Sequence, residues 1–315
     1  KEYLIILYSM TTNPKLDIYL NDKSDKLSKS SLDNYSRLYK KIHLHFGVGD
    51  GKAEPVDIPE EDLIIAINND MTTYQGEIIT NPNTKTALFN TIIGVKKHLD
   101  LPNTKLLKAK ENLLGSIIKH REDVREQKSV SLPTHKDLKN HFNNTFERSE
   151  WIGTIILSLM EEFFTRNQDL DIYIVNSIKK AKDKNKNYLV LREADLVYVK
   201  NKYKTKKSYG QLKQIFKNKK TRTAVVEFLK TQPPDQFEYP LLVNTNGEKL
   251  DDTSQAKFIK KFTFKNLSES DYFKIRVNEF EKKSDMNGLL KASKRRGTNL
   301  NTIIQNYSLR NIKPL

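Results

Sequence analysis

The stretch "NYLVLREADLVYVKNKYKTKKSYGQLKQIF", from Asn187 to Phe216, alternates apolar and polar residues around Leu196 to Val199, turns through a lysine-rich segment, and then alternates again. Alternation with a period of two is typical of β-strands that bury one face, and a polar turn between two such runs is typical of a hairpin. We therefore predict a β-hairpin or small antiparallel sheet here, with lysines near its tip.

Before this stretch, apolar residues recur at the spacing of helices. One such segment covers residues 31–47, where it begins with a cap-like serine and stops at a glycine, and two more cover residues 84–100 and 109–127. These patterns predict an all-helical domain over residues 1–130.

A polar segment at residues 127–138 is the predicted linker, because it contains Pro133 and restarts a helix at Thr134 or Asp137. Helical patterns then continue through residues 151–181 and return after the hairpin. The second predicted domain, residues 131–315, therefore combines helices with the small sheet. The expected fold class is mainly α with a small antiparallel β-sheet.

The charge of the chain favours a polyanionic partner. The 315 residues contain 55 Lys and Arg against 39 Asp and Glu, and the window from Lys179 to Lys230 alone contains 17 basic and 4 acidic residues. Such a local excess predicts a face that follows the phosphates of nucleic acid, with Lys202, Lys206 and Lys207 in it. A lysine-rich composition also occurs on ordinary solvated surfaces, so charge alone leaves both interpretations open.

Other classes of protein fit less well. The chain has no cysteine, which excludes disulfides, thiolate metal sites and a cysteine nucleophile. Its six histidines lack cysteine partners and the spacing of a zinc site, so no metal is expected. Apolar runs such as Trp151–Met160 are far shorter than the roughly 20 residues that span a bilayer. We expect an intracellular protein, located wherever its DNA target lies, with no membrane partner and no secretion.

A tyrosine close to the C-terminus, Tyr307 in "IIQNYSL", has the companions that DNA cleavage needs. A tyrosine that attacks a phosphodiester requires positively charged hydrogen-bond donors at the non-bridging oxygens and a proton donor for the leaving oxygen. Arginine suits the first task because its planar fork donates two parallel bonds, and lysine suits the second. Arg166, Lys204 and Arg276 precede Tyr307 in this order.

This ordered set resembles the tyrosine recombinase/integrase family, and especially the divergent branch of large DNA viruses, virophages and related mobile elements. Thr298 lies 22 residues after Arg276 and 9 residues before Tyr307, which matches the family's spacing from its second arginine to a His or Trp and on to the nucleophile. Asp169 lies three residues after Arg166, at the position of an acidic residue that helps orient the first arginine.

The resemblance implies a helical core-binding domain that clamps one face of the duplex and a catalytic domain that carries the site. Tyr307 would form a 3′-phosphotyrosyl link, Arg166 and Arg276 would hold the scissile phosphate, and Lys204 would protonate the leaving 5′ oxygen. No metal, nucleotide or other small-molecule cofactor is implied. The implied partner is double-stranded DNA, bound by a homotetramer on paired sites, and the implied activity is site-specific recombination or integration.

Two positions depart from the family's pattern. Phe273 replaces the histidine of its His-x-x-Arg motif, and Thr298 replaces its His or Trp, so two donors are missing or come from other residues. Nearby candidates are Lys274, Lys294, Arg295 and Arg296, and the last three are also expected to bind DNA.

Three alternatives remain open at this point. The chain is a catalytically weakened or inactive DNA-binding relative, an unrelated basic virion or architectural DNA-binding protein, or a type IB topoisomerase or telomere resolvase that uses the same nucleophile.

Overall fold

The computed structural model of the chain describes residues 13–47, 54–233 and 238–309. The chain divides into two compact units, Lys1–Val124 and Arg125–Leu315, a few residues before the boundary predicted at residue 130. Each unit has its own hydrophobic core, and each is described by itself.

The described part of the first unit is helical. Its elements are α2 (Pro14–Lys23), α3 (Lys29–His45), η1 (Pro55–Asp57), α4 (Glu60–Ile65), the π-helical turn η2 (Ala66–Asp70), α5 (Pro82–His98), α6 (Thr104–Asn112) and the first part of α7 (Leu114–Ser131). The helices predicted over 31–47 and 84–100 are present as α3 and α5, and the one predicted over 109–127 is divided at Leu113. Apolar residues of α3 and α5, among them Tyr39 and Phe89, form the centre of this core.

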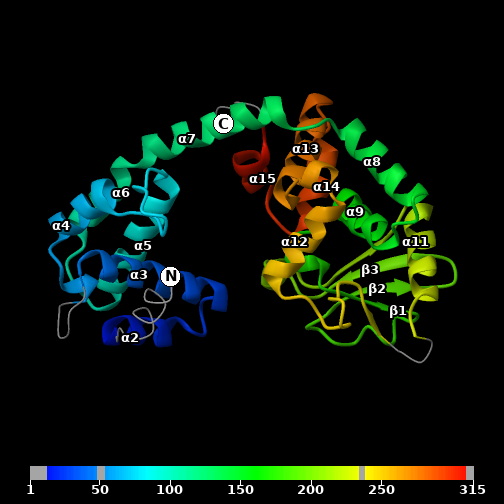
Figure 1. The fold of residues 1–315 in the computed structure, drawn as a ribbon, viewed down its shortest axis with the longest axis horizontal. Coiled ribbons are helices and arrows are strands. Elements are labelled where there is room, and N and C mark those ends of the chain that lie inside the picture. The colour runs from blue at the N-terminus through cyan, green and yellow to red at the C-terminus, as the bar shows by residue number, and fades with distance from the viewer. Residues whose placement is uncertain (1–12, 48–53, 234–237, 310–315) are drawn as a thin grey trace. The chain divides into compact units, whose positions relative to one another are not determined.

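The second unit contains the remaining helices. They are α8 (His135–Glu147), α9 (Trp151–Phe163), α10 (Lys206–Tyr209), α11 (Lys219–Lys230), α12 (Asp252–Phe262), α13 (Glu269–Lys282), α14 (Met286–Arg296) and α15 (Leu300–Tyr307), with short 3₁₀ turns at η3 (Asn167–Leu170) and η4 (Phe264–Asn266). The predicted helix start at Thr134 is confirmed, because Asp137 N donates to the Thr134 hydroxyl and the Asp137 carboxylate accepts from Thr134 N. Helix α9 is apolar almost all round and contacts α8, α11, α12, α13 and α14 (Figure 1).

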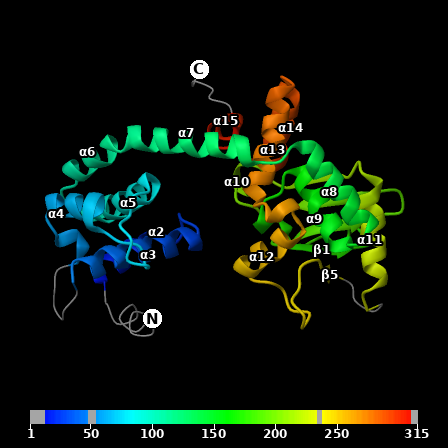
Figure 2. The same ribbon diagram turned by 45° about the horizontal axis from the view of Figure 1, so that its top comes forward.

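A five-stranded sheet completes the second unit. Its strands are β1 (Ile172–Val175), β2 (Asn187–Leu191), β3 (Leu196–Lys200), β4 (Leu212–Ile215) and β5 (Tyr239–Pro240), in the order β4-β3-β2-β1-β5. Strands β2, β3 and β4 pair in antiparallel fashion, which confirms the predicted hairpin. The lysine-rich turn that joins β3 to β4 contains α10 (Figure 2). Strand β1 runs parallel to β2, so the sheet is mixed. The expected class, mainly α with a small sheet, is confirmed.

Two local predictions differ from the structure. The helical pattern predicted through 151–181 ends at Phe163, because Phe164 adopts a left-handed conformation with φ 54°, and residues 172–175 form β1 instead. A short apolar run such as this one fits a buried strand as well as a helix, and pairing with β2 decides between them. In the predicted linker, α7 stays helical as far as Ser131.

Among the described residues, no helix is both long enough and apolar enough to cross a membrane.

Candidate active site

Tyr307 is the last residue of α15 and is half-buried. The helix starts at Asn299, whose side-chain oxygen accepts a hydrogen bond from Thr302 N at 2.7 Å. The Tyr307 ring packs edge-on against the ring of Phe273, with centroids 4.8 Å apart and planes at 73°. Its hydroxyl lies 3.3 Å from Nη2 of Arg296. The predicted nucleophile therefore has a guanidinium as its polar neighbour.

Arg296, which the sequence analysis expected to bind DNA and offered as a candidate for a missing donor, is buried and only 1% exposed. Its Nη1 donates to the carbonyl of Phe164 at 2.9 Å, and its Nη2 donates to the carboxylate of Glu269. Its guanidinium also lies 4.1 Å from the centroid of the Phe273 ring. The residue ends α14 on the same buried stripe as Ala292, which explains why it points inward.

Arg166 completes this group. It follows the end of α9 and precedes η3, and its Nη1 donates to the carbonyl of Arg296 at 2.8 Å. Burial is the main cause that lowers the pKa of Arg166, and the charge of Arg296 adds to it. Nearby Asp169, Tyr307 and Glu269 oppose this shift, and an arginine stays charged in proteins. We refer to Arg166, Glu269, Arg296 and Tyr307 as the tyrosine corner.

Asp169 fixes the backbone of Arg166 in the tyrosine corner. Its carboxylate accepts a hydrogen bond from the backbone N–H of Arg166 at 3.0 Å and forms an ion pair with Lys200 at 2.7 Å. Both partners of the ion pair are buried, and burial lowers the pKa of Lys200 while Asp169 opposes this effect. Asp169 therefore holds the turn of Arg166 through the backbone. Lys200 was not predicted, although the alternation of β3 places it on the same face as the buried Tyr198.

The loop of Lys204 lies against the turn between α14 and α15. Lys204 itself is exposed. Its neighbour Thr205 donates a hydrogen bond from its hydroxyl to the carbonyl of Gly297. Gly297 has a φ of +66°, and a Cβ atom there would lie 2.7 Å from the ring of Tyr203. We refer to residues 201–211, between β3 and β4, as the lysine loop, and it is docked next to Arg296 and Thr298.

Thr298, nine residues before Tyr307 in the sequence, is buried, with 8% of its surface exposed. Its backbone N–H donates to the carbonyl of Ser293 at 3.0 Å, and its carbonyl accepts from the Ser293 hydroxyl. These bonds fix the turn that joins α14 to α15, so the contacts of Thr298 position the backbone that leads to the tyrosine.

Arg276 does not belong to the tyrosine corner. Its Nη1 lies 2.8 Å from Nδ1 of His135, and its Nε lies 3.3 Å from Oε1 of Glu161. Nε2 of His135 lies 2.7 Å from the same carboxylate oxygen and also 2.7 Å from Nη1 of Arg276, so the imidazole contacts both charged side chains. We refer to Arg276, His135 and Glu161 as the histidine corner. It connects α13, α8 and α9.

Phe164 stands between the two corners. Its carbonyl accepts from Arg296, whereas its ring centroid lies 6.0 Å from the guanidinium carbon of Arg276. Arg296 and Arg276 therefore contact different parts of Phe164, the first its carbonyl and the second its ring.

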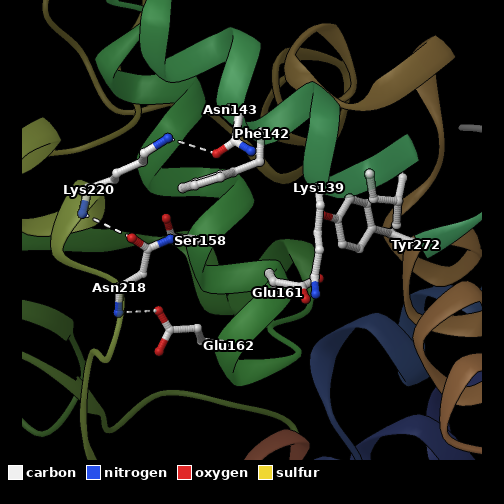
Figure 3. Close-up of a pocket in the computed structure, with 10 residues that line it drawn as sticks. Lys139, Phe142, Asn143, Ser158, Glu161, Glu162, Asn218, Lys220 and Tyr272 are labelled. Carbon is white, nitrogen blue, oxygen red and sulfur yellow. Dashed lines mark hydrogen bonds between the residues drawn. The ribbon is translucent and has the colours of Figure 1, made fainter. Parts of the chain in front are cut away.

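The histidine corner opens onto two neighbouring cavities. One, of about 340 Å³, is drawn in Figure 3, where Glu161 lies near Lys139 and Tyr272, and Asn218 donates its backbone N–H to Glu162. The other, of about 620 Å³, is lined by Arg276 and by basic residues of its rim, namely Lys217, Lys291 and Arg295.

The predicted DNA-binding residues differ in exposure and in whether their side chains contact other groups of the protein. Lys207 and Lys294 are exposed. Lys202 pairs with an aspartate at 3.3 Å, and Lys206 Nζ donates to a backbone carbonyl at 2.7 Å. Arg295 is half-buried, donates to the carbonyl of residue 162 and lies over the ring of residue 163.

The chain was compared with protein families, curated proteins and solved structures. No protein-family model matches the chain, and no curated protein matches it. Among solved structures, the chain is similar to a "Crystal structure of XerA recombinase", with 12% sequence identity and a TM-score of 0.38 over 95% of both chains.

Proposed function

We propose that the chain is a DNA strand-transferase of the tyrosine recombinase type, with Tyr307 as its nucleophile. The observation that carries this proposal is the tyrosine corner, where the Tyr307 hydroxyl lies 3.3 Å from Arg296 and Arg166 is hydrogen-bonded to the same residue. Two guanidinium groups beside a phenol form a suitable environment for a phosphodiester that gains negative charge as it is attacked. Lone packing tyrosines do not need such neighbours.

The proposed reaction exchanges one phosphoester bond for another. The oxygen of Tyr307 bonds to phosphorus, the bond from phosphorus to the 5′ oxygen breaks, and the DNA keeps a 3′-phosphotyrosyl link. The phenolic proton leaves to solvent, and the departing 5′ oxygen receives a proton from Lys204 in the role that the family resemblance gives it. The docking of the lysine loop on Gly297 supports this role for Lys204.

Double-stranded DNA is the proposed substrate. The basic window from Lys179 to Lys230 contains the lysine loop and therefore lies next to the tyrosine corner. By resemblance, the proposal includes a homotetramer on paired sites, a helical core-binding domain over residues 1–130, and target sites that belong to a virus or mobile element. Reaction through a phosphotyrosine requires neither a metal ion nor a nucleotide.

A second candidate is a weakened, DNA-binding relative of the family. The substitutions at Phe273 and Thr298 favour it, because the first puts an apolar ring under Tyr307 and the second supplies no charged donor. General acid–base help is worth about 10²–10⁴-fold, so its loss alone slows a reaction without removing the nucleophile.

A covalent trap tests the proposal. The full chain is incubated with a pool of nicked duplexes of random sequence, so that a short 5′-hydroxyl fragment diffuses away after cleavage and strands the protein on DNA. We expect adducts that survive denaturing detergent and that carry nucleotide on Tyr307 in peptide mass spectra. Sequencing the trapped DNA then identifies the preferred site.

Tyr307→Phe is the matched control, because it removes one oxygen and keeps the ring on Phe273. It should bind DNA like the wild type and form no adduct. DNA binding by the wild type with no adduct on any duplex of the pool would leave the weakened relative as the function. An adduct on another residue would contradict the choice of nucleophile.

A further inference from the structure

The cation beside the nucleophile is not the arginine that spacing alone selects. Arg296 contacts the Tyr307 hydroxyl, whereas the guanidinium of Arg276 is engaged with His135 and Glu161. During attack the phosphorus must come within bonding distance of the tyrosine oxygen, so a guanidinium 3.3 Å from that oxygen is within reach of the non-bridging oxygens.

The hydrogen bonds of Arg296 leave it one donor to spare. Nη1 and Nη2 have partners, but Nε is buried and has no hydrogen-bond partner in the described part of the chain. Buried donors without a partner are rare and unfavourable in folded proteins. Nε of Arg276 is also buried without a partner, so this feature alone does not distinguish the two arginines. Arg296 is the one that contacts the Tyr307 hydroxyl, and a donor without a partner at that place suits a ligand that accepts hydrogen bonds.

The charges of the tyrosine corner also leave room for one anion. Asp169 is neutralised by its ion pair with Lys200, and Glu269 is the carboxylate that contacts Arg296. Arg166 and Arg296 therefore share one carboxylate and retain one positive charge. A single phosphodiester, which carries one negative charge, would balance it.

Glu269 is suited to hold the guanidinium of Arg296 in place. It is the first residue of α13, where the helix N-terminus favours a negative side chain. The helix start is fixed by Ser268, whose hydroxyl accepts from the N–H of Asp271 at 3.1 Å. Glu269 therefore has a rigid base from which to orient Arg296.

We infer that Arg296, rather than Arg276, is the second arginine that acts on the scissile phosphate, and that Glu269 is its positioning residue. This inference rests on the proposed function. Arg296 is covered by Tyr307 in the DNA-free chain, and Ile303 is the only fully buried residue of α15. In this inference the phosphate contacts Arg166 before it contacts Arg296. It reaches Arg296 only after the end of α15, with Tyr307, has moved aside.

The test compares Arg296→Lys with Arg276→Lys in the full chain. Both keep a positive charge and lose the planar fork, so they form a matched pair. Each is assayed for its rate of adduct formation on the trapped duplex, first with a phosphodiester and then with a neutral methylphosphonate at the scissile position. Noncovalent DNA affinity and thermal unfolding are measured beside the rates.

On the phosphodiester we expect Arg296→Lys to slow adduct formation by about 10²–10³-fold at nearly unchanged DNA affinity. Its deficit relative to wild type should be smaller on the methylphosphonate, because the neutral substrate needs less charge stabilisation. Arg276→Lys should stay within about tenfold of wild type on both substrates. This selectivity for substrate charge separates an action on phosphate from a structural role.

Glu269→Gln provides a second measure if Arg296→Lys does not fold. The amide oxygen still accepts from Arg296, so adduct formation should exceed that of Glu269→Ala, which leaves the guanidinium without this partner. An equal deficit of Arg296→Lys on both substrates, or a charge-selective deficit of Arg276→Lys, would overturn the inference alone. Equal rates for the two Glu269 variants would do the same. A wild type that forms no adduct would overturn the proposed function and this inference with it.

Discussion

The tyrosine corner and the histidine corner use the same kinds of residue for different ends. Each contains a largely buried arginine, a glutamate and an aromatic ring, and Phe164 separates them. In the histidine corner, Arg276, His135 and Glu161 contact one another and join three helices, although Nε of Arg276 and Oε2 of Glu161 have no hydrogen-bond partner among the described residues. In the tyrosine corner, Arg296 contacts Glu269 and Arg166 donates to the backbone carbonyl of Arg296, so the corner has two arginines and one glutamate. A buried arginine whose charge is balanced by a glutamate stabilises a fold, whereas a surplus of positive charge beside a phenol prepares a site for an anion.

Breaking the histidine corner should affect stability most. Arg276→Gln leaves Glu161 with His135 as its remaining partner, and we expect a loss of about 3 kcal/mol in the free energy of unfolding, near the lower limit for a broken buried ion pair. Urea denaturation checks this value. Arg222→Gln is the control, because Arg222 donates to backbone carbonyls on the surface. A loss no larger than that of the control would show that the network does not hold the helices together.

Breaking the tyrosine corner should affect cleavage instead. Arg166→Ala removes a guanidinium close to the proposed nucleophile, and we expect adduct formation to slow by about 10²–10³-fold, with DNA affinity largely retained. Single-turnover cleavage on the trapped duplex measures the rate. If Arg276→Gln lowers the rate per folded molecule by the same factor as Arg166→Ala, the functional distinction between the corners is wrong.

The histidine corner should also respond to acid. Burial raises the pKa of Glu161, but its hydrogen bond with His135 and the charge of Arg276 outweigh burial, so this pKa lies below its ordinary value. A carboxyl group with a lowered pKa in the folded state adds stability above its unfolded pKa of about 4.3, and this stability is lost as pH falls through the folded pKa. The free energy of unfolding of the wild type should therefore exceed that of Glu161→Gln by about 1–3 kcal/mol at neutral pH, and this difference should disappear below about pH 4. Urea midpoints across this range measure it, and a constant difference would contradict the assignment.

Substitutions in the lysine loop should have the smallest effect of those considered, because each contact with a phosphate contributes little to the affinity for DNA. Replacing Lys202, Lys206 and Lys207 together with glutamine should weaken binding to all DNA sequences, and each lost contact should reduce the slope of log affinity against log salt by about 0.9. The same charge change at Lys257, Lys260 and Lys261 of α12 is the control. Equal slopes for the two triple variants would remove the lysine loop from the DNA interface.

The sheet and most helices could be predicted because their patterns repeat over many residues. The alternation from residue 187 onward predicts the hairpin, and helical spacing predicts α3 and α5. Strand β1 was missed because its four residues are too few to show a period, and its parallel pairing with β2 is not local information. The end of α9 was missed because its left-handed position is occupied by Phe164 and not by glycine, the residue that usually marks such a helix end.

Spacing along the chain predicted Arg166 and Tyr307 in one site but not which second arginine lies beside them. Composition alone does not distinguish Arg295 from Arg296, because they are neighbouring residues of the same type. Adjacent residues of a helix point about 100° apart, so the two side chains lie on different faces of α14. Their helical period does distinguish them, because Leu289, Ala292 and Arg296 share the buried stripe of α14. This signal was available in the sequence. The partners of Arg276, in contrast, come from helices more than a hundred residues away.

The hydrogen bond from Thr205 to Gly297 has a consequence for how the site assembles during folding. It joins residues 92 positions apart, and the bonds from Arg296 to Phe164 and from Arg166 to Arg296 join residues 132 and 130 positions apart. Contacts of such high contact order form slowly, after the local helices. Helices α13 to α15 as an isolated fragment would lack all three bonds. Tyr307, the proposed nucleophile, therefore acquires its charged neighbours only in a chain whose sheet and α9 have already docked.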